Sequence, residues 1–529
     1  MLTKKSRIIC SIALALSVFI LSACQPSPTQ DIITSKDDDS FDINTLESIP
    51  NTKSGNAEDV TIPLNESDRK PESEASVFQW QSEFSSTDGS VIFITNIQQE
   101  IPSSGLPVVE VAPHFWTEED ARQISKALFG DCVFYEAPPK LGELEDIFTK
   151  EELQKAVQRW SVYTNEQALL ELFPKMSARK DRMDLYLNRV KDEVTNCGTM
   201  LEGMPDTSLY GEAKWEFQPE WKYIYPEDSV PEEFRTDADG NEQIFVTTTV
   251  DDIPYQMIVT AYKGSEYKLN TLFVYPDSVY SPVGIDRDIF RAQLCRTNKP
   301  SAEQIENVKK NAEDMLNRMA VGEWAVEECY LENTNPEGIP EYVIHMNATP
   351  VFEGVAAMYR TQLDNFSENY APSYYLTEAA MQFSANGDLV SLQLSSPLDV
   401  VRVASQDTAV MAIDELMEKA ETYLTLSDYY AYGLSGELLE SYQESAGEKL
   451  RCNIELNRLD YGLIRVKAAE SNDNYYYIPG IILSGSFDYC GQDSGTVNES
   501  SGDSFGAKQT IPIVAINALD GSVIDLSKG

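Results

Sequence analysis

The amino-acid sequence predicts an α+β protein in which helix-then-antiparallel-meander units form two or more domains behind a disordered N-terminal stalk. Three observations predict this class. Asp-Gly or Asn-Gly turns recur between apolar runs at Asp88-Gly89, Asp239-Gly240, Asn386-Gly387 and Asp520-Gly521, and such turns favour hairpins over a doubly wound parallel sheet. Amphipathic helices with recognisable N-caps stand between the hairpins. A long polar stretch precedes all of them.

Residues 1–23 are expected to be a signal peptide rather than part of the fold. A short basic start is followed by an apolar run from Ile8 to Leu21 and by two small residues, Ser22 and Ala23. This order is typical of an export signal. The apolar run is shorter than the ~20 residues that cross a bilayer comfortably, which disfavours a retained transmembrane helix.

The end of this segment, Leu21-Ser22-Ala23-Cys24, resembles the cleavage motif of bacterial lipoproteins. The resemblance implies that the Cys24 thiol carries diacylglycerol, that cleavage occurs before it, and that fatty chains such as palmitate anchor the protein. Each buried methylene contributes about 0.8 kcal/mol, so two or more chains make a durable anchor. We therefore expect a protein bound to the cell membrane through Cys24, on the extracytoplasmic face.

Residues 24–76 are expected to be a disordered acidic and polar tether. Ser, Asp, Glu, Asn, Pro and Lys dominate this stretch, and Phe41 is its only aromatic residue. A flexible coil of about fifty residues has a root-mean-square span of roughly 40 Å, enough to lift a folded body clear of the head groups.

The charge of the chain excludes some partners. The formal net charge is -45, and removal of the three basic residues of the signal takes it to -48. Such a surface repels nucleic acid and anionic phospholipid. With 42% apolar and 10% aromatic residues, the chain has enough apolar side chains to bury a core.

Two α+β domains are expected after the tether, at residues 77–295 and 296–529. Helices are predicted from Thr117 to Gly130, from Ser301 to Met319 and over 407–424, each followed by strand-like sequence. The strand-like runs are residues 131–137, 323–333, 451–459 and 462–470. Another helical block, 149–197, should be interrupted at Pro174.

No known catalytic or cofactor motif is present, and no cofactor or metal is expected. The two histidines, His114 and His345, belong to no spaced metal-binding pair. Nucleophile-elbow, phosphate-loop and dinucleotide fingerprints are missing. The run Asp237 to Asn241 begins like a calcium loop, but Glu242 stands where an EF-hand needs glycine, so we predict a hairpin turn.

A row of aromatic side chains is the best candidate for ligand or partner binding. Trp215, Phe217, Trp221, Tyr223 and Tyr225 alternate with polar residues. In an extended strand they would share one face, which could stack on sugar rings or hold a partner's apolar anchor. The alternative is that this face belongs to the core of a sheet.

Six cysteines follow Cys24, with no C-x-x-C among them: Cys132, Cys197, Cys295, Cys329, Cys452 and Cys490. Fifteen pairings are open, and buried free thiols are the alternative to one or two bridges. Cys452 with Cys490 is the disulfide to test first.

The layout resembles uncharacterised surface lipoproteins of Gram-positive anaerobes. Residues 379–400 and 516–526 are also similar to membrane-tethered extracytoplasmic regulators of cell-wall sensor kinases. The resemblance implies a lipid-anchored, non-catalytic binding or sensor module whose partner is an unknown protein or glycan. The alternatives are a cell-surface hydrolase that uses carboxylates on glycans and a transporter's solute-binding receptor.

Overall fold

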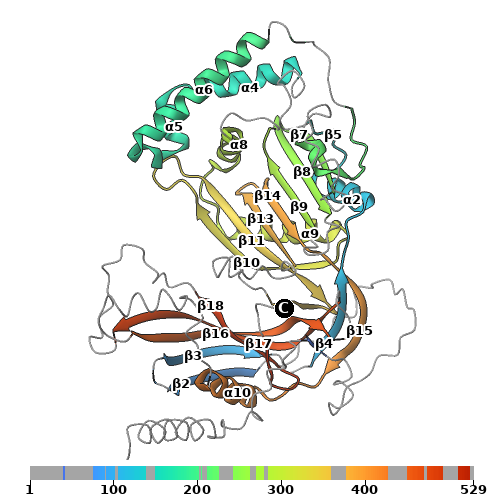
Figure 1. The fold of residues 1–529 in the computed structure, drawn as a ribbon, viewed down its shortest axis with the longest axis vertical. Coiled ribbons are helices and arrows are strands. Elements are labelled where there is room, and N and C mark those ends of the chain that lie inside the picture. The colour runs from blue at the N-terminus through green and yellow to red at the C-terminus, as the bar shows by residue number, and fades with distance from the viewer. Residues whose placement is uncertain are drawn as a thin grey trace, which may run out of the picture.

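The protein has an α+β architecture built on two large, mainly antiparallel sheets (Figure 1). The computed structural model describes residues 40–41, 76–101 apart from 88 and 90, 105–138, 149–201, 204, 211–224, 242–261, 270–278, 284–358, 377–426, 450–469, 474–491 and 510–524. In the part of the chain that is described, no helix is long and apolar enough to span a bilayer. The signal segment and Cys24 lie outside these residues.

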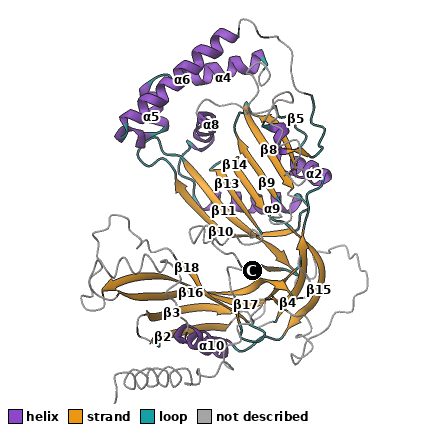
Figure 2. Cartoon of the chain, in the orientation of Figure 1, coloured by secondary structure: helices purple, strands orange, loops and turns teal. Residues whose placement is uncertain are grey.

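Sheet A forms the lower half of the molecule in Figure 2 and has the strand order β15-β4-β17-β16-β3-β2. Two parallel pairs, β16 with β3 and β1 with β16, interrupt its antiparallel pattern. Its strands are β1 (Ser40–Phe41), β2 (Ser76–Ser85), β3 (Val91–Ile101), β4 (Leu106–Pro113), β15 (Leu398–Thr408), β16 (Leu450–Ala468), β17 (Tyr475–Gly491), β18 (Ile511–Asn517) and β19 (Val523–Ile524). Helix α10 (Ile413–Leu426) packs its apolar stripe against this sheet.

Sheet B is antiparallel throughout its described pairs and has the order β10-β11-β13-β14-β9-β8-β7-β5. Its strands are β5 (Tyr135–Glu136), β6 (Gln218–Pro219), β7 (Glu242–Val250), β8 (Ile253–Ala261), β9 (Thr271–Pro276), β10 (Glu323–Asn333), β11 (Tyr342–Phe352), β12 (Val355–Ala356), β13 (Glu378–Ser384) and β14 (Leu389–Ser395). Helices α2 (Glu118–Phe129) and α9 (Ala302–Arg318) bury their apolar stripes against one face of this sheet.

The other helices form a block at the end of sheet B. They are α4 (Lys150–Val162), α5 (Glu166–Leu172), α6 (Lys180–Met200) and α8 (Ile285–Cys295), with the short 3₁₀ helix η2 (Pro174–Ala178) between α5 and α6. A shared cluster of buried side chains joins α4, α5, α6 and α8. Leu294 and Cys295 of α8 in turn pack on Val343 and Val390 of the sheet.

The two sheets divide the chain differently from the expected boundary at 295/296. Every strand of sheet B falls between β4 and β15, so this sheet is nested inside the sequence of sheet A. Position 295 lies between β9 and β10, which belong to the same sheet. The boundary expected from alternating helices and meanders therefore falls inside one hydrogen-bonded unit.

The chain passes between the sheets at two points that lie side by side. Leu398 of β15 pairs with Pro113 of β4, and the His114 N–H donates to the Pro397 carbonyl at 2.8 Å. The His114 ring lies 2.9 Å from Asp399 through Nδ1 and 3.1 Å from Asp120 through Nε2. This histidine thus joins both crossings to the start of α2.

Most of the local sequence predictions are confirmed. The turns at Gly89, Gly387 and Gly521 join or precede antiparallel partners, and all three glycines have positive φ. Helices α2 and α9 follow the predicted N-caps Thr117 and Ser301, each of which forms a capping box, and the 149–197 block breaks at Pro174. The predicted turn at Asp237 to Asn241 lies outside the described residues.

Three elements differ from expectation. The strand after α2 is reduced to Tyr135–Glu136. The two runs at 451–459 and 462–470 form one strand, β16, with an irregularity between Leu456 and Arg458. The helix expected from 407 begins at Ile413, because residues up to Thr408 pair with β4.

Part of the expected tether is also structured. Ser40–Phe41 form β1, which pairs in parallel with Lys467–Ala468 of β16. The one aromatic residue of the tether, Phe41, therefore lies in a strand against sheet A.

Candidate functional site

The aromatic row predicted at 215–225 is only partly extended. Trp215 and Phe217 pack against the core of sheet B, while Lys214 and Glu216 are exposed. Within the row only Gln218–Pro219 form a strand, β6, which gives way to the 3₁₀ helix η3 (Glu220–Tyr223). This change breaks the alternation on which the single aromatic face depended.

The remaining members of the row have different environments. Tyr223 packs its ring 5.6 Å from that of Phe245 and donates its hydroxyl to the Gln243 carbonyl at 3.2 Å. Trp221 is half-buried, with Lys222 Nζ 6.0 Å from its ring centre. Tyr225 lies outside the described residues. Trp215, Phe217 and Tyr223 thus support the fold, and Trp221 is the member left for contact with a partner.

The cysteines proposed as a disulfide lie on neighbouring strands but one position out of register. Cys452 of β16 pairs with Tyr489, and Cys490 of β17 pairs with Arg451. Directly opposite residues share a face of the sheet and successive residues alternate between faces. This register therefore does not make Cys452 and Cys490 a cross-strand pair. Cys132, Cys197, Cys295 and Cys329 are free thiols, of which Cys197 and Cys295 are fully buried.

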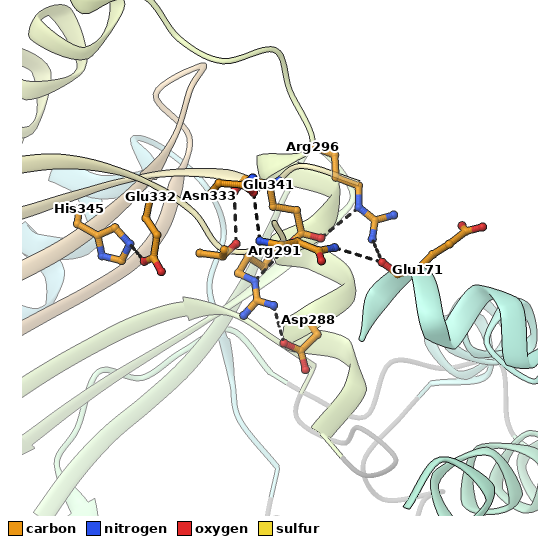
Figure 3. Close-up of polar contacts among 10 residues, drawn as sticks. Glu171, Asp288, Arg291, Arg296, Glu332, Asn333, Glu341 and His345 are labelled. Carbon is orange, nitrogen blue, oxygen red and sulfur yellow. Dashed lines mark hydrogen bonds and ion pairs between the residues drawn. The ribbon is translucent and has the colours of Figure 1, made fainter. Parts of the chain in front are cut away.

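A polar and aromatic group on β10 and β11 is the strongest candidate site. Tyr330 and His345 are direct cross-strand partners, and their rings stack with centroids 4.7 Å apart and planes 1° from parallel. Tyr330 is nevertheless 52% exposed. His345 Nε2 lies 2.8 Å from the Glu332 carboxylate (Figure 3).

Neutral amides complete this group. The Asn347 amide donates to Glu328 at 3.2 Å, and Gln382 Nε2 lies 3.5 Å from His345 Nδ1. Burial lowers the pKa of His345, although the nearby Glu332 opposes the shift. Burial thus favours the uncharged imidazole, and His345 orients Tyr330 by stacking and Glu332 by its 2.8 Å contact. We call Glu328, Tyr330, Glu332 and His345 the Tyr330 site.

An ion cluster closes the end of the hairpin beside the Tyr330 site. Glu341 is 1% exposed and contacts two guanidinium groups, Arg296 Nε at 3.1 Å and Arg291 Nε at 3.5 Å. Arg291 also contacts Asp288 at 3.0 Å, and Arg296 donates to the Glu171 carbonyl at 3.1 Å (Figure 3). The positive charges of Arg291 and Arg296 thus balance the negative charges of Asp288 and Glu341.

This ion cluster is a structural clamp. It ties α8 and the end of α5 to the β10–β11 turn, where Asn333 Oδ1 accepts from the backbone N–H of Asn335 and of Glu341. Removing one partner of such a buried pair leaves an uncompensated charge. The clamp thus fixes the end of β10 that carries Glu332.

Sequence reasoning placed His345 in no metal-binding pair and did not identify the Tyr330 site. The strand pattern was available, because Glu328, Tyr330 and Glu332 alternate along β10. The sequence alone does not show that His345 is the partner of Tyr330, because only the β10–β11 register places the two side chains opposite each other. Among the described residues, no group of three or more His, Cys, Asp or Glu side chains is placed to hold a metal ion.

Comparisons with known proteins add little to this geometry. No protein-family model matches the chain, and no curated protein matches it. Among solved structures, the chain is similar to an uncharacterised protein from Eubacterium rectale ATCC 33656, with 11% identity and a TM-score of 0.35. The alignment covers 82% of this chain and 91% of that one.

Proposed function

We propose that the protein is a lipid-anchored extracytoplasmic binding or sensor module, held to the membrane through Cys24 and engaging its ligand at the Tyr330 site. The Leu21-Ser22-Ala23-Cys24 motif behind a complete export signal supports the anchor. The strongly negative body supports a role away from nucleic acid and anionic lipid.

One observation carries the binding role: Tyr330 is held flat by His345 and still leaves half of its surface in solvent. An exposed aromatic ring whose orientation is fixed by its neighbours loses little entropy when a ligand stacks on it. The hydrogen bonds around it use carboxylates and amides, which can orient a polar ligand.

The anchor is tested by intact-mass analysis of the full chain purified from its native membrane. We expect the mass of a polypeptide that begins at Cys24 and carries fatty chains. An unmodified Cys24, or a retained leader, would contradict the anchor.

The binding role is tested by thermal-shift screening of the full chain against sugars, peptides and amines. A ligand should raise the Tm of the wild type and leave that of Tyr330→Ala unchanged, with circular dichroism reporting the same fold. A ligand that stabilises both proteins equally would show that the Tyr330 site is not used. Turnover of a glycan would instead favour the carboxylate-dependent hydrolase.

A further inference from the structure

The Tyr330 site carries net negative charge on both sides of an exposed ring. Glu328, Tyr330 and Glu332 occupy alternate positions of β10, so their side chains leave the same face of the sheet. Burial raises the pKa of Tyr330, and the charges of Glu332 and Glu328 raise it further. Both carboxylates thus act electrostatically on the tyrosine ring.

The groups that hold the two carboxylates are an amide and a buried imidazole, not a lysine or an arginine. Glu328 accepts from the neutral amide of Asn347, and Glu332 contacts His345, whose pKa burial lowers. The nearest arginines of the hairpin end, Arg291 and Arg296, contact Glu341. Among the described residues, no lysine or arginine forms an ion pair with Glu328 or Glu332.

Two charged residues of sheet A, Arg458 and Asp460 of β16, also lie near Glu328 of the Tyr330 site. Asp460 of β16 has its pKa raised by burial, and the charge of Glu328 contributes, while Arg458 at 2.8 Å opposes the shift. Glu327 precedes Glu328 at the irregularity of β10; burial raises its pKa, and the charges of Lys309 and Arg458 oppose the rise. Arg458 forms its ion pair with Asp460.

We propose that the Tyr330 site binds an organic ammonium group, with the cation over the free face of Tyr330 and between Glu328 and Glu332; this rests on the binding role proposed above. The face of an aromatic ring attracts a cation through its quadrupole, and flanking carboxylates add a Coulomb attraction. A neutral sugar would gain stacking and hydrogen bonds but no charge attraction. A divalent metal draws its oxygen ligands to within about 2.5 Å of one point, whereas Glu328 and Glu332 stand four residues apart along β10, about 13 Å in an extended strand.

The test titrates the full chain with choline and with its uncharged isostere 3,3-dimethylbutan-1-ol, followed by NMR or calorimetry. Nα-acetyl-lysine methylamide, in a second arm, distinguishes a primary from a quaternary ammonium. We expect saturable binding of at least one cation, weakened by added salt, and no saturable binding of the alcohol.

Variants locate the binding. Tyr330→Ala should weaken cation binding about tenfold or more, because it removes the ring. Tyr330→Phe should keep it within about twofold, and Glu332→Gln should weaken it about fivefold by removing one charge. Tyr135→Ala is the matched control, because Tyr135 is 40% exposed on the opposite edge strand of sheet B, and it should leave binding unchanged.

Equal binding of choline and the alcohol would overturn the ammonium assignment, as would unchanged affinity in Tyr330→Ala. If the cations fail but another ligand gives a Tyr330-dependent thermal shift, only the ligand class is wrong. An unmodified Cys24 would overturn the anchor without touching this result.

Discussion

At the scale of single residues, two neighbouring buried carboxyl groups have opposite environments. Asp286 is fully buried and accepts two hydrogen bonds of 2.7 Å from Arg159, one of 2.8 Å from Trp160 and one from Ser278. For Asp277 the nearest cation is Arg287 at 3.9 Å. Burial, together with the charge of Asp286, raises the pKa of Asp277 to about 7.

This environment predicts a pH dependence of stability. The pKa of Asp277 rises from 3.8 to about 7 on folding, so the folded state holds a proton that the unfolded state has released between these values. The free energy of unfolding should therefore fall as pH rises from about 4 to about 7, by up to about 1.4 kcal/mol per unit. Asp277→Asn should lose this slope and exceed the wild type in stability at pH 8. Urea unfolding of the wild type and of Asp277→Asn at pH 5 and pH 8 measures both effects. The same change in the free energy of unfolding between these pH values in the two proteins would show that Asp277 is not the titrating group.

Two members of the predicted aromatic row, Trp221 and Tyr223, should differ in how much they stabilise the fold. Tyr223→Ala removes a ring packed on Phe245 and a hydrogen bond to Gln243, so it should cost about 3 kcal/mol of stability. Trp221 and Tyr223 are both half-buried, but the charge contact of the Trp221 ring is with the exposed Lys222, so Trp221→Ala should cost less, about 1 kcal/mol. Denaturant unfolding of the two variants measures the difference. A larger loss for Trp221→Ala would show that it, and not Tyr223, anchors the segment.

At the scale of elements, the predictions succeeded where the signal is local. Ser301 and Gln304, or Thr117 and Asp120, complete their capping boxes within one turn of helix, so the sequence alone locates these starts. The start of α10 could not be found in this way. Its first predicted residues extend β15, whose partner β4 lies about three hundred positions earlier in the sequence.

The cap of α9 can be tested directly. Ser301 Oγ accepts the Gln304 N–H at 3.2 Å, and Gln304 Oε1 accepts the Ser301 N–H at 2.9 Å. Ser301→Ala should lower the free energy of unfolding by about 1 kcal/mol, and Ser301→Asp should restore most of it. Chemical denaturation provides the measurement. No loss in Ser301→Ala would mean that packing of the α9 stripe on sheet B alone sets the start of the helix.

At the scale of the whole molecule, the nesting of sheet B could not be predicted. The fold class follows from hairpin turns and helix starts, but pairing between β4 and β15 or between β3 and β16 joins distant segments. The Tyr330 site has the same character. Its three β10 residues are visible in the sequence, whereas His345 comes from a register and the clamp at Glu341 from helices α5 and α8.

Nesting predicts which fragments fold. Residues 114–397 contain all strands of sheet B with α2, α8 and α9, so this fragment should unfold cooperatively on its own. Fragments 77–295 and 296–529 each cut sheet B and should give no cooperative transition. Near-ultraviolet circular dichroism during urea unfolding distinguishes the three. Cooperative unfolding of 77–295 would restore the boundary at 295/296.

The pairing of β1 with β16 limits how far the folded body can stand from the proposed anchor. Ser40–Phe41 pair with Lys467–Ala468, and sixteen positions separate Cys24 from Ser40 in the sequence. Sixteen residues span at most about 55 Å, so a lipid on Cys24, as proposed above, would keep the Lys467 end of β16 within that distance of the bilayer. The residues after Phe41 would add nothing to this limit.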